Sequence, residues 1–257
     1  MCVSARSMAV LTTAGLLTAA VFCNPAAADG KEHPLKPAIR IARKCLEKVE
    51  SVSGYHATVT KKELVNNTMI SQRMRMKLRR EPFSVYFYFE GDLEGREVIY
   101  VEGRNNGNLL VHETGLAGLI GTLELSPTGG PAMSENRHPI TMAGIENFLK
   151  ATVQQWEKES KYGEIDVKYY KDAKLEDMTC SVIEATHPEP RKQFPYQMTR
   201  LWIDDESGMT VRLQLYGFPV RSGDKPPILE DYAFTNLRTD VRITDRDFDR
   251  NNPKYNF

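Results

Sequence analysis

The chain has 257 residues, of which 41% are hydrophobic and 26% are charged, so it is long enough to form a sizeable hydrophobic core. Its 34 Lys and Arg residues are balanced by 34 Asp and Glu residues, which gives a formal net charge of zero. A protein with this balance lacks the overall positive field with which nucleic-acid-binding proteins attract phosphates. We therefore predict no nucleic-acid partner.

The amino-terminal segment is typical of a secretory signal peptide. Arg6 supplies a short basic region, residues 8–22 are mostly apolar, and Ala26-Ala27-Ala28 offers the small residues of a cleavage site. The apolar stretch is shorter than the roughly 20 residues that span a bilayer. We predict a signal peptide over residues 1–28 and an exported protein, either periplasmic or secreted.

The predicted mature chain starts with a polar, flexible lead over residues 29–37, followed by a helix. Apolar residues recur at helical spacing from residue 38 onward, and Ser53-Gly54 ends the pattern. The stripe contains Ile39, Ala42, Leu46 and Val49.

Five short strands are predicted between residues 55 and 111. In the second of them, residues 69–79, basic and apolar residues alternate, which is the period of a strand with one dry and one wet face. Asn105-Asn106-Gly107 is typical of a hairpin turn, so the strands form an antiparallel meander. The dry positions of the second and third strands are Met74, Met76, Leu78, Val85, Phe87 and Phe89.

A central helix is predicted from Thr141 to about residue 162, because apolar residues including Phe148 and Trp156 recur there at helical spacing. A second set of strands follows, with a hairpin across residues 204–208 and a final strand over residues 228–237. The alternation places one pair of residues on a common face before the turn and a second pair after it: Leu201 and Ile203, then Val211 and Leu213. We predict one α+β domain over residues 38–257, a long antiparallel sheet covered by the two helices.

The basic residues of the second strand lie on the face opposite to its methionines. They are Arg73, Arg75, Lys77 and Arg79. Such a row fits a phosphate-binding surface, or the solvated outer face of a sheet whose charges prevent aggregation. We favour the outer face, since acidic residues elsewhere cancel the charge overall.

Cys45 and Cys180 remain after removal of the predicted signal peptide. An exported compartment permits a disulfide between them, and two separate buried thiols are the alternative; the sequence leaves both open. No Cys-x-x-Cys or Cys/His cluster is present, so we predict no metal and no cofactor. None of the five histidines belongs to a nucleophile motif, and no Gly-x-Ser-x-Gly motif occurs, so we predict no catalytic residue.

Two parts of the chain resemble known families. The hairpin of residues 201–213 carries Trp-Ile-Asp, an acidic Ser-Gly turn and a second strand, and it is similar to a hairpin of the periplasmic lipoprotein-carrier (LolA-like) superfamily. Residues 137–141, Arg-His-Pro-Ile-Thr, with the ending Asp249–Tyr255, look like the bacterial family of domain of unknown function 1571. The resemblance covers about residues 38–257. It implies an unclosed antiparallel β-barrel, a curved sheet wrapped around the N-terminal and central helices and enclosing a hydrophobic cavity.

From the apolar strand face and this resemblance we predict an exported, non-enzymatic protein that binds an acyl chain, a lipid or a lipidated protein on its concave face. The alternative is an envelope sensor or scaffold module whose core is closed and whose partner is a protein. We also predict a monomer in peripheral contact with a membrane. The predicted binding residues are Met74, Met76, Leu78, Val85, Phe87, Phe89, Leu201, Ile203, Val211 and Leu213.

Overall fold

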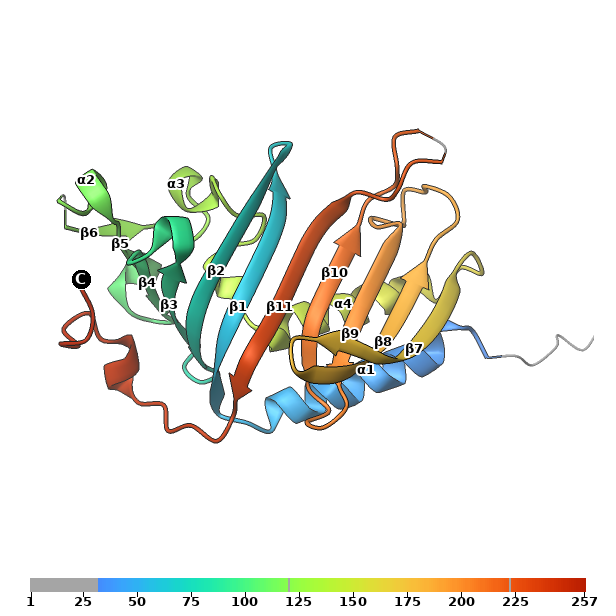
Figure 1. Cartoon of the computed structure of the whole chain (residues 1–257), viewed down its shortest axis with the longest axis horizontal. Helices are drawn as coiled ribbons and strands as arrows, with labels where there is room; N and C mark the ends of the chain where they lie inside the picture. The colour runs from blue at the N-terminus through green and yellow to red at the C-terminus, as the bar shows by residue number, and fades with distance from the viewer. Residues whose placement is uncertain (1–31, 120, 222) are drawn as a thin grey trace, which may run out of the picture. The chain divides into compact units, whose positions relative to one another are not determined.

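The computed structural model describes residues 32–119, 121–221 and 223–257, so the predicted signal peptide lies outside the described residues. Eleven strands of the described part form one antiparallel sheet in the order β6-β5-β4-β3-β2-β1-β11-β10-β9-β8-β7. The sheet is open between β6 and β7, and α1 and α4 lie on the same side of it (Figure 1). The predicted α+β fold with an unclosed antiparallel sheet is confirmed.

The helices are α1 (Leu35–Glu50), α2 (Gly115–Gly118), α3 (Gly130–Met133) and α4 (Ile145–Glu159), with single 3-10 turns η1 (Gly91–Leu93), η2 (Asn105–Gly107), η3 (Ile140–Met142) and η4 (Asp245–Phe248). The first six strands are β1 (Gly54–Val65), β2 (Thr68–Arg79), β3 (Ser84–Glu90), β4 (Glu97–Val101), β5 (Leu109–His112) and β6 (Thr122–Leu125). The last five are β7 (Asp166–Leu175), β8 (Met178–Thr186), β9 (Met198–Asp204), β10 (Thr210–Tyr216) and β11 (Ile228–Arg238).

The last strand joins the two predicted strand sets into one sheet. β11 pairs with β1 on one side and with β10 on the other. The register places Phe234 opposite Val59, and Val59 opposite Met74. Residues directly opposite in a sheet point to the same face. These side chains therefore form a continuous apolar row across three strands, and all three are buried in the main core.

Helix α1 begins at Leu35, three residues before the predicted boundary at residue 38, so residues 35–37 belong to the helix and not to the lead. Leu35 is fully buried, which holds the first turn against the core. Pro37 is compatible with this position, because the N–H groups of a first turn have no partner within the helix.

Helix α4 begins at Ile145, four residues after the predicted start. The Ile145 N–H donates to the Tyr55 hydroxyl at 2.8 Å, so a strand side chain caps the helix. Gly144 precedes it with φ +99° and ψ 162°, a combination that is essentially restricted to glycine. This backbone turn separates α4 from η3, where the predicted helix had already begun.

The carboxyl-terminal residues pack on the convex face of β2–β5. Tyr255 stacks on Tyr86 with ring centroids 4.1 Å apart, and Phe248 is buried in the same small cluster. Lys77 pairs with Asp247 at 2.7 Å. The predicted basic row is therefore solvated only in part: Arg73 and Arg75 are exposed, whereas Lys77 and Arg79 lie under this tail.

Cys45 and Cys180 are both free and buried, so a disulfide between them does not form. Cys45 lies on α1 in the core of the concave face. Cys180 alternates along β8 with Ile183, a residue of that same core, so its side chain points to the convex face and the sheet separates the two thiols. Burial raises the pKa of Cys45, and it raises the pKa of Cys180 to about 11.

Within the described ranges, no helix combines the length and the apolar character needed to cross a membrane.

Candidate functional site

A cavity of about 650 Å³ lies between the concave face of the sheet, helix α4 and the segment of residues 126–144, which we call the strap. Its volume falls within the range of about 300–1,000 Å³ that is typical of small-molecule sites. The row of Val59, Met74 and Phe234 forms part of its floor. Met76, Phe87 and Val98 form the next row across β2, β3 and β4.

Half of the predicted binding residues line this cavity. They are Met74, Met76, Phe87, Phe89 and Leu213. Methionine side chains are flexible and polarizable, and they adapt to apolar ligands of variable shape. That these five residues bind a ligand stays a prediction.

The structure places the other five predicted residues elsewhere. Val85, Leu201 and Ile203 lie in the closed core, and Leu78 lines a second, smaller cavity of about 290 Å³ beside Tyr55 and Gly144. A register shift between Thr210 and Arg212 interrupts the alternation of β10, so Val211 lies at a bulge. The prediction that Val211 and Leu213 share one face assumed an unbroken alternation along the strand, and this bulge interrupts that alternation.

One end of the cavity is polar, which we did not predict. Lys61 and Glu63 follow Val59 on the inner face of β1, and both are buried. The β1–β11 register places Glu63 directly opposite Glu230, which is also buried. The sequence contained a usable indication, because the alternation of the first strand puts Lys61 and Glu63 on the same face as Val59.

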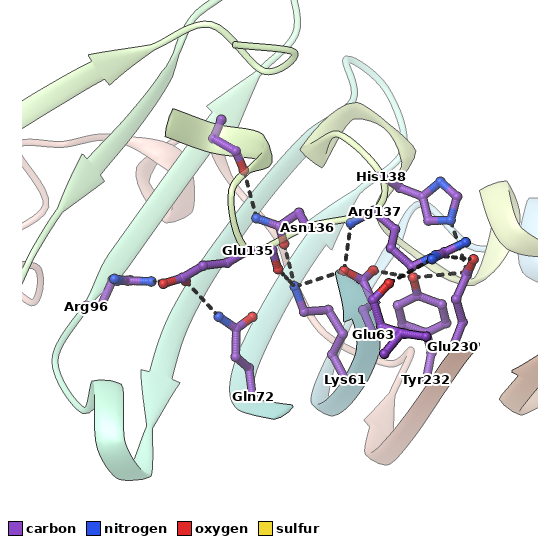
Figure 2. A network of polar contacts seen from close by, with 12 residues as sticks. Lys61, Glu63, Gln72, Arg96, Glu135, Asn136, Arg137, His138, Glu230 and Tyr232 are labelled. Carbon is purple, nitrogen blue, oxygen red and sulfur yellow. Dashed lines mark hydrogen bonds and ion pairs between the residues drawn. The ribbon is translucent and has the colours of Figure 1, made fainter. Parts of the chain in front are cut away.

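The strap binds both of these carboxylates (Figure 2). The Arg137 backbone N–H donates to Glu63 Oε2 at 2.8 Å, and Arg137 Nε donates to Glu230 Oε1 at 2.9 Å. His138 Nε2 lies 3.0 Å from Glu230 Oε2. The Tyr232 hydroxyl lies within hydrogen-bonding distance of both carboxylates and so bridges them.

Contacts to other strands hold the residues of the strap that precede Arg137. Lys61 Nζ donates to the Asn136 side chain and to the Glu135 carbonyl oxygen, the latter at 3.3 Å. The Glu135 carboxylate accepts from Arg96 at 2.8 Å and from Gln72 at 3.1 Å. Charged side chains from β1, β11 and the β3–β4 connection therefore anchor one short piece of the strap over the cavity.

The electrostatics favour an ion pair between His138 and Glu230. The hydrogen bond to Glu230 raises the pKa of His138 above its ordinary value. Burial opposes ionisation of Glu230, but hydrogen bonds from His138 and Arg137 outweigh it and lower the pKa of Glu230. Burial lowers the pKa of Lys61, although the neighbouring Glu63 favours the charged form. The network pairs opposite charges, and its evident role is to fix the strap.

We expect the His138 imidazole to titrate with a midpoint above 6.5, its ordinary pKa, in an NMR pH titration. The raised pKa of His138 and the lowered pKa of Glu230 mean that this ion pair stabilises the fold fully between pH 4.5 and pH 6.5, the ordinary pKa values of the two groups. The contribution is lost as the pH rises through the midpoint of His138, and again as it falls through the midpoint of Glu230. Glu230→Gln should move the midpoint down toward the ordinary value.

His56 serves as the internal reference, because burial lowers its pKa. A His138 midpoint at or below that of His56 would contradict the ion pair.

A family model described as a protein of unknown function (DUF1571) matches residues 52–257, four fifths of the chain. This match confirms the family resemblance predicted from residues 137–141 and the chain ending. Comparison with curated proteins finds no match.

Several solved structures are similar to this chain at low sequence identity. LprF from Mycobacterium bovis has a TM-score of 0.47 and 14% identity, with 82% of this chain and 98% of that chain covered. The lipoprotein LppX from Mycobacterium tuberculosis has a TM-score of 0.46 and 15% identity, with 81% and 100% covered. A putative outer membrane lipoprotein-sorting protein domain from Vibrio parahaemolyticus has a TM-score of 0.39 and 15% identity, with 83% and 96% covered.

Proposed function

This chain belongs to the DUF1571 family of proteins of unknown function, and we propose that it binds an acyl chain or a lipidated partner in the cavity between its sheet and α4. The observation that carries the proposal is the cavity itself. It has an apolar floor of Met, Phe and Val side chains, several of which belong to the main buried core.

The energetics of apolar burial support this proposal. Burial of apolar surface contributes about 25 cal/mol per Å², so one acyl chain enclosed here gains several kcal/mol. A scaffold module with a closed core would fill this space with its own side chains. The cavity therefore favours a ligand-binding protein over the scaffold alternative.

In this proposal the protein acts by binding, without a covalent step. The charged groups at the polar end of the cavity are paired with one another: Lys61 with Glu63, Arg96 with Glu135, and Arg137 and His138 with Glu230. We assign them to holding the strap over the ligand.

Export is part of the same proposal and rests on the amino-terminal sequence. Residues 1–28 have the pattern of a cleaved signal peptide, and in this proposal the single binding domain begins with helix α1 at Leu35. The ligand would then be met outside the cytoplasm, in the periplasm or after secretion.

Native mass spectrometry tests the proposal. The full-length chain is produced with its amino-terminal segment, purified from the envelope fraction without detergent, and compared with protein from which lipid has been extracted. We expect a mass increment that disappears on extraction, and the extract should contain an acyl lipid. The proposal fails if no increment is found and a fluorescent acyl probe does not bind the extracted protein.

A further inference from the structure

Two strongly exposed leucines stand together on the turn between β5 and β6. Leu116 on α2 is 86% exposed, and Leu119 directly after this helix is 84% exposed. Apart from Val220, the other exposed large apolar side chains in the described part of the chain reach at most 49%. We call residues 115–119 the knuckle; it lies at the β6 edge of the sheet (Figure 1). Single apolar residues on a surface are normal, whereas adjacent ones this far out of the fold indicate a partner.

The backbone of the knuckle holds its leucines outward. Gly115 has φ +62°, a conformation that reverses the chain directly before Leu116. A Cβ atom at Gly118 would lie 2.7 Å from the Glu113 carbonyl oxygen, so the inner side of the turn closes on its own backbone. That side has no room for a side chain. The exposure of Leu116 and Leu119 is therefore a property of the turn itself.

The knuckle is uncharged, and the nearest carboxylates along the chain are paired. The sequence between Glu113 and Glu124 contains no charged residue, in a chain of which 26% is charged. Glu113 pairs with Arg96 at 2.8 Å, and Glu124 pairs with Arg250 at 3.8 Å. Because these carboxylates are compensated, the knuckle neither repels anionic headgroups nor depends on them for attraction.

The size of the knuckle favours a bilayer over a protein as the partner. A stable protein–protein interface buries about 800 Å² on each partner. Two leucine side chains supply a small part of that area, and the charged residues at either end of the turn do not extend the apolar surface. Insertion into a bilayer needs no complementary surface, because apolar side chains there enter the boundary between headgroups and acyl chains.

Both strands that carry the knuckle contribute to the wall of the cavity. Glu113, which precedes the knuckle, lines the cavity, and so does Leu125 at the end of β6. Leu109 and Val111 of β5 line it as well. A bilayer in contact with the knuckle would therefore lie beside strands that form the cavity wall.

We infer that the knuckle inserts Leu116 and Leu119 into the apolar boundary of a lipid bilayer and so docks the protein on a membrane surface. Docking by the knuckle does not require a ligand in the cavity, so it is a lipid contact beyond the proposed function. Each of the two is measured separately, and either can fail while the other stands.

Flotation with phosphatidylcholine vesicles tests this docking surface. Protein purified from the envelope fraction is compared with the double variant Leu116→Ser/Leu119→Ser and with Val220→Ser. Val220 is the matched control, because it is 97% exposed on the β10–β11 connection, which β1–β4 separate from the knuckle in the sheet. We expect the partition into vesicles to fall by about tenfold or more in the double variant and to stay unchanged in the control. The double variant should bind the fluorescent acyl probe as wild type does.

A tryptophan in the knuckle reports insertion directly. Leu116→Trp keeps a large apolar side chain, and tryptophan is enriched at membrane interfaces, so this variant should bind vesicles at least as tightly as wild type. Phosphatidylcholine brominated on its acyl chains should quench its fluorescence beyond any quenching of the native Trp156 and Trp202. This readout follows the knuckle itself and does not depend on the amino-terminal segment.

Any of five results would overturn the inference. The first three are wild-type protein that does not float with vesicles, a double variant that binds them as wild type does, and an equal loss of binding in Val220→Ser. The fourth is fluorescence of Leu116→Trp that brominated lipid does not quench. The fifth is a wild-type dimer that the double variant dissociates in analytical ultracentrifugation, which would assign the knuckle to a second copy of this chain.

Discussion

Gly144→Ala is expected to lower the free energy of unfolding by about 2–3 kcal/mol. Gly144 adopts φ +99° immediately before α4, and a Cβ atom there would lie 2.5 Å from Leu78 Cδ1 and 3.0 Å from the Tyr55 hydroxyl. The substitution therefore strains the backbone and disturbs the hydroxyl that caps α4. Urea unfolding followed by circular dichroism measures the loss.

Gly163→Ala is the matched control, because a Cβ atom at Gly163 meets no atom within 4 Å. It should change stability by no more than about 0.5 kcal/mol. Equal stability of the two variants would show that the turn before α4 tolerates a side chain. It would also show that the Tyr55 hydroxyl can cap α4 without a glycine at position 144.

Met74→Trp is expected to lower the affinity for a fluorescent acyl probe at least tenfold while leaving the fold intact. Met74 lies in the floor of the cavity, so the larger side chain has space to occupy and takes the place of the ligand. We expect its free energy of unfolding to stay within about 1 kcal/mol of wild type. Probe titration and urea unfolding are measured on the same preparation.

Leu201→Trp provides the contrast, because Leu201 is fully buried in the closed core. Overpacking there should cost about 1–3 kcal/mol and leave the affinity of the folded protein unchanged. If Met74→Trp binds the probe as wild type does, the ligand does not occupy this cavity. If it is as destabilised as Leu201→Trp, the cavity does not offer free space.

The strand faces could be predicted because they depend on local alternation. Met74, Met76 and Leu78 alternate with basic residues within one strand, and all three are buried as that pattern indicates. The final strand was also predicted, but its place between β1 and β10 was not, since pairing between ends of the chain leaves no periodic pattern.

The sequence could not show which apolar residues of the concave face line the cavity and which lie in the closed core. Leu201 and Met74 are both buried apolar strand residues of the concave face, but only Met74 lines the cavity. Which of them faces free space depends on how the helices and the strap pack on the sheet, and strand alternation carries no information about that packing. The bulge at Val211 likewise depends on pairing with β9 and is not visible in the alternation of β10 alone.

The polar end of the cavity was missed for a related reason. Glu63 and Glu230 are far apart in the chain and become neighbours only through the β1–β11 register. Considered singly, each is a charged residue that a strand normally exposes. The Arg137-His138 motif was noticed for its resemblance to a family, and its physical role, pairing with Glu230, required the fold.

The most direct test of acyl binding on the concave face is an NMR experiment on protein with ¹³C-labelled methionine methyl groups and a bound acyl ester. Met74 and Met76 line the cavity, whereas Met69 is 43% exposed near the β1–β2 turn and serves as the internal control. We predict nuclear Overhauser contacts from the methylene protons of the chain to the Met74 and Met76 methyl groups. Contacts to Met69 alone, or no contacts to any of the three, would contradict a ligand site between the sheet and α4.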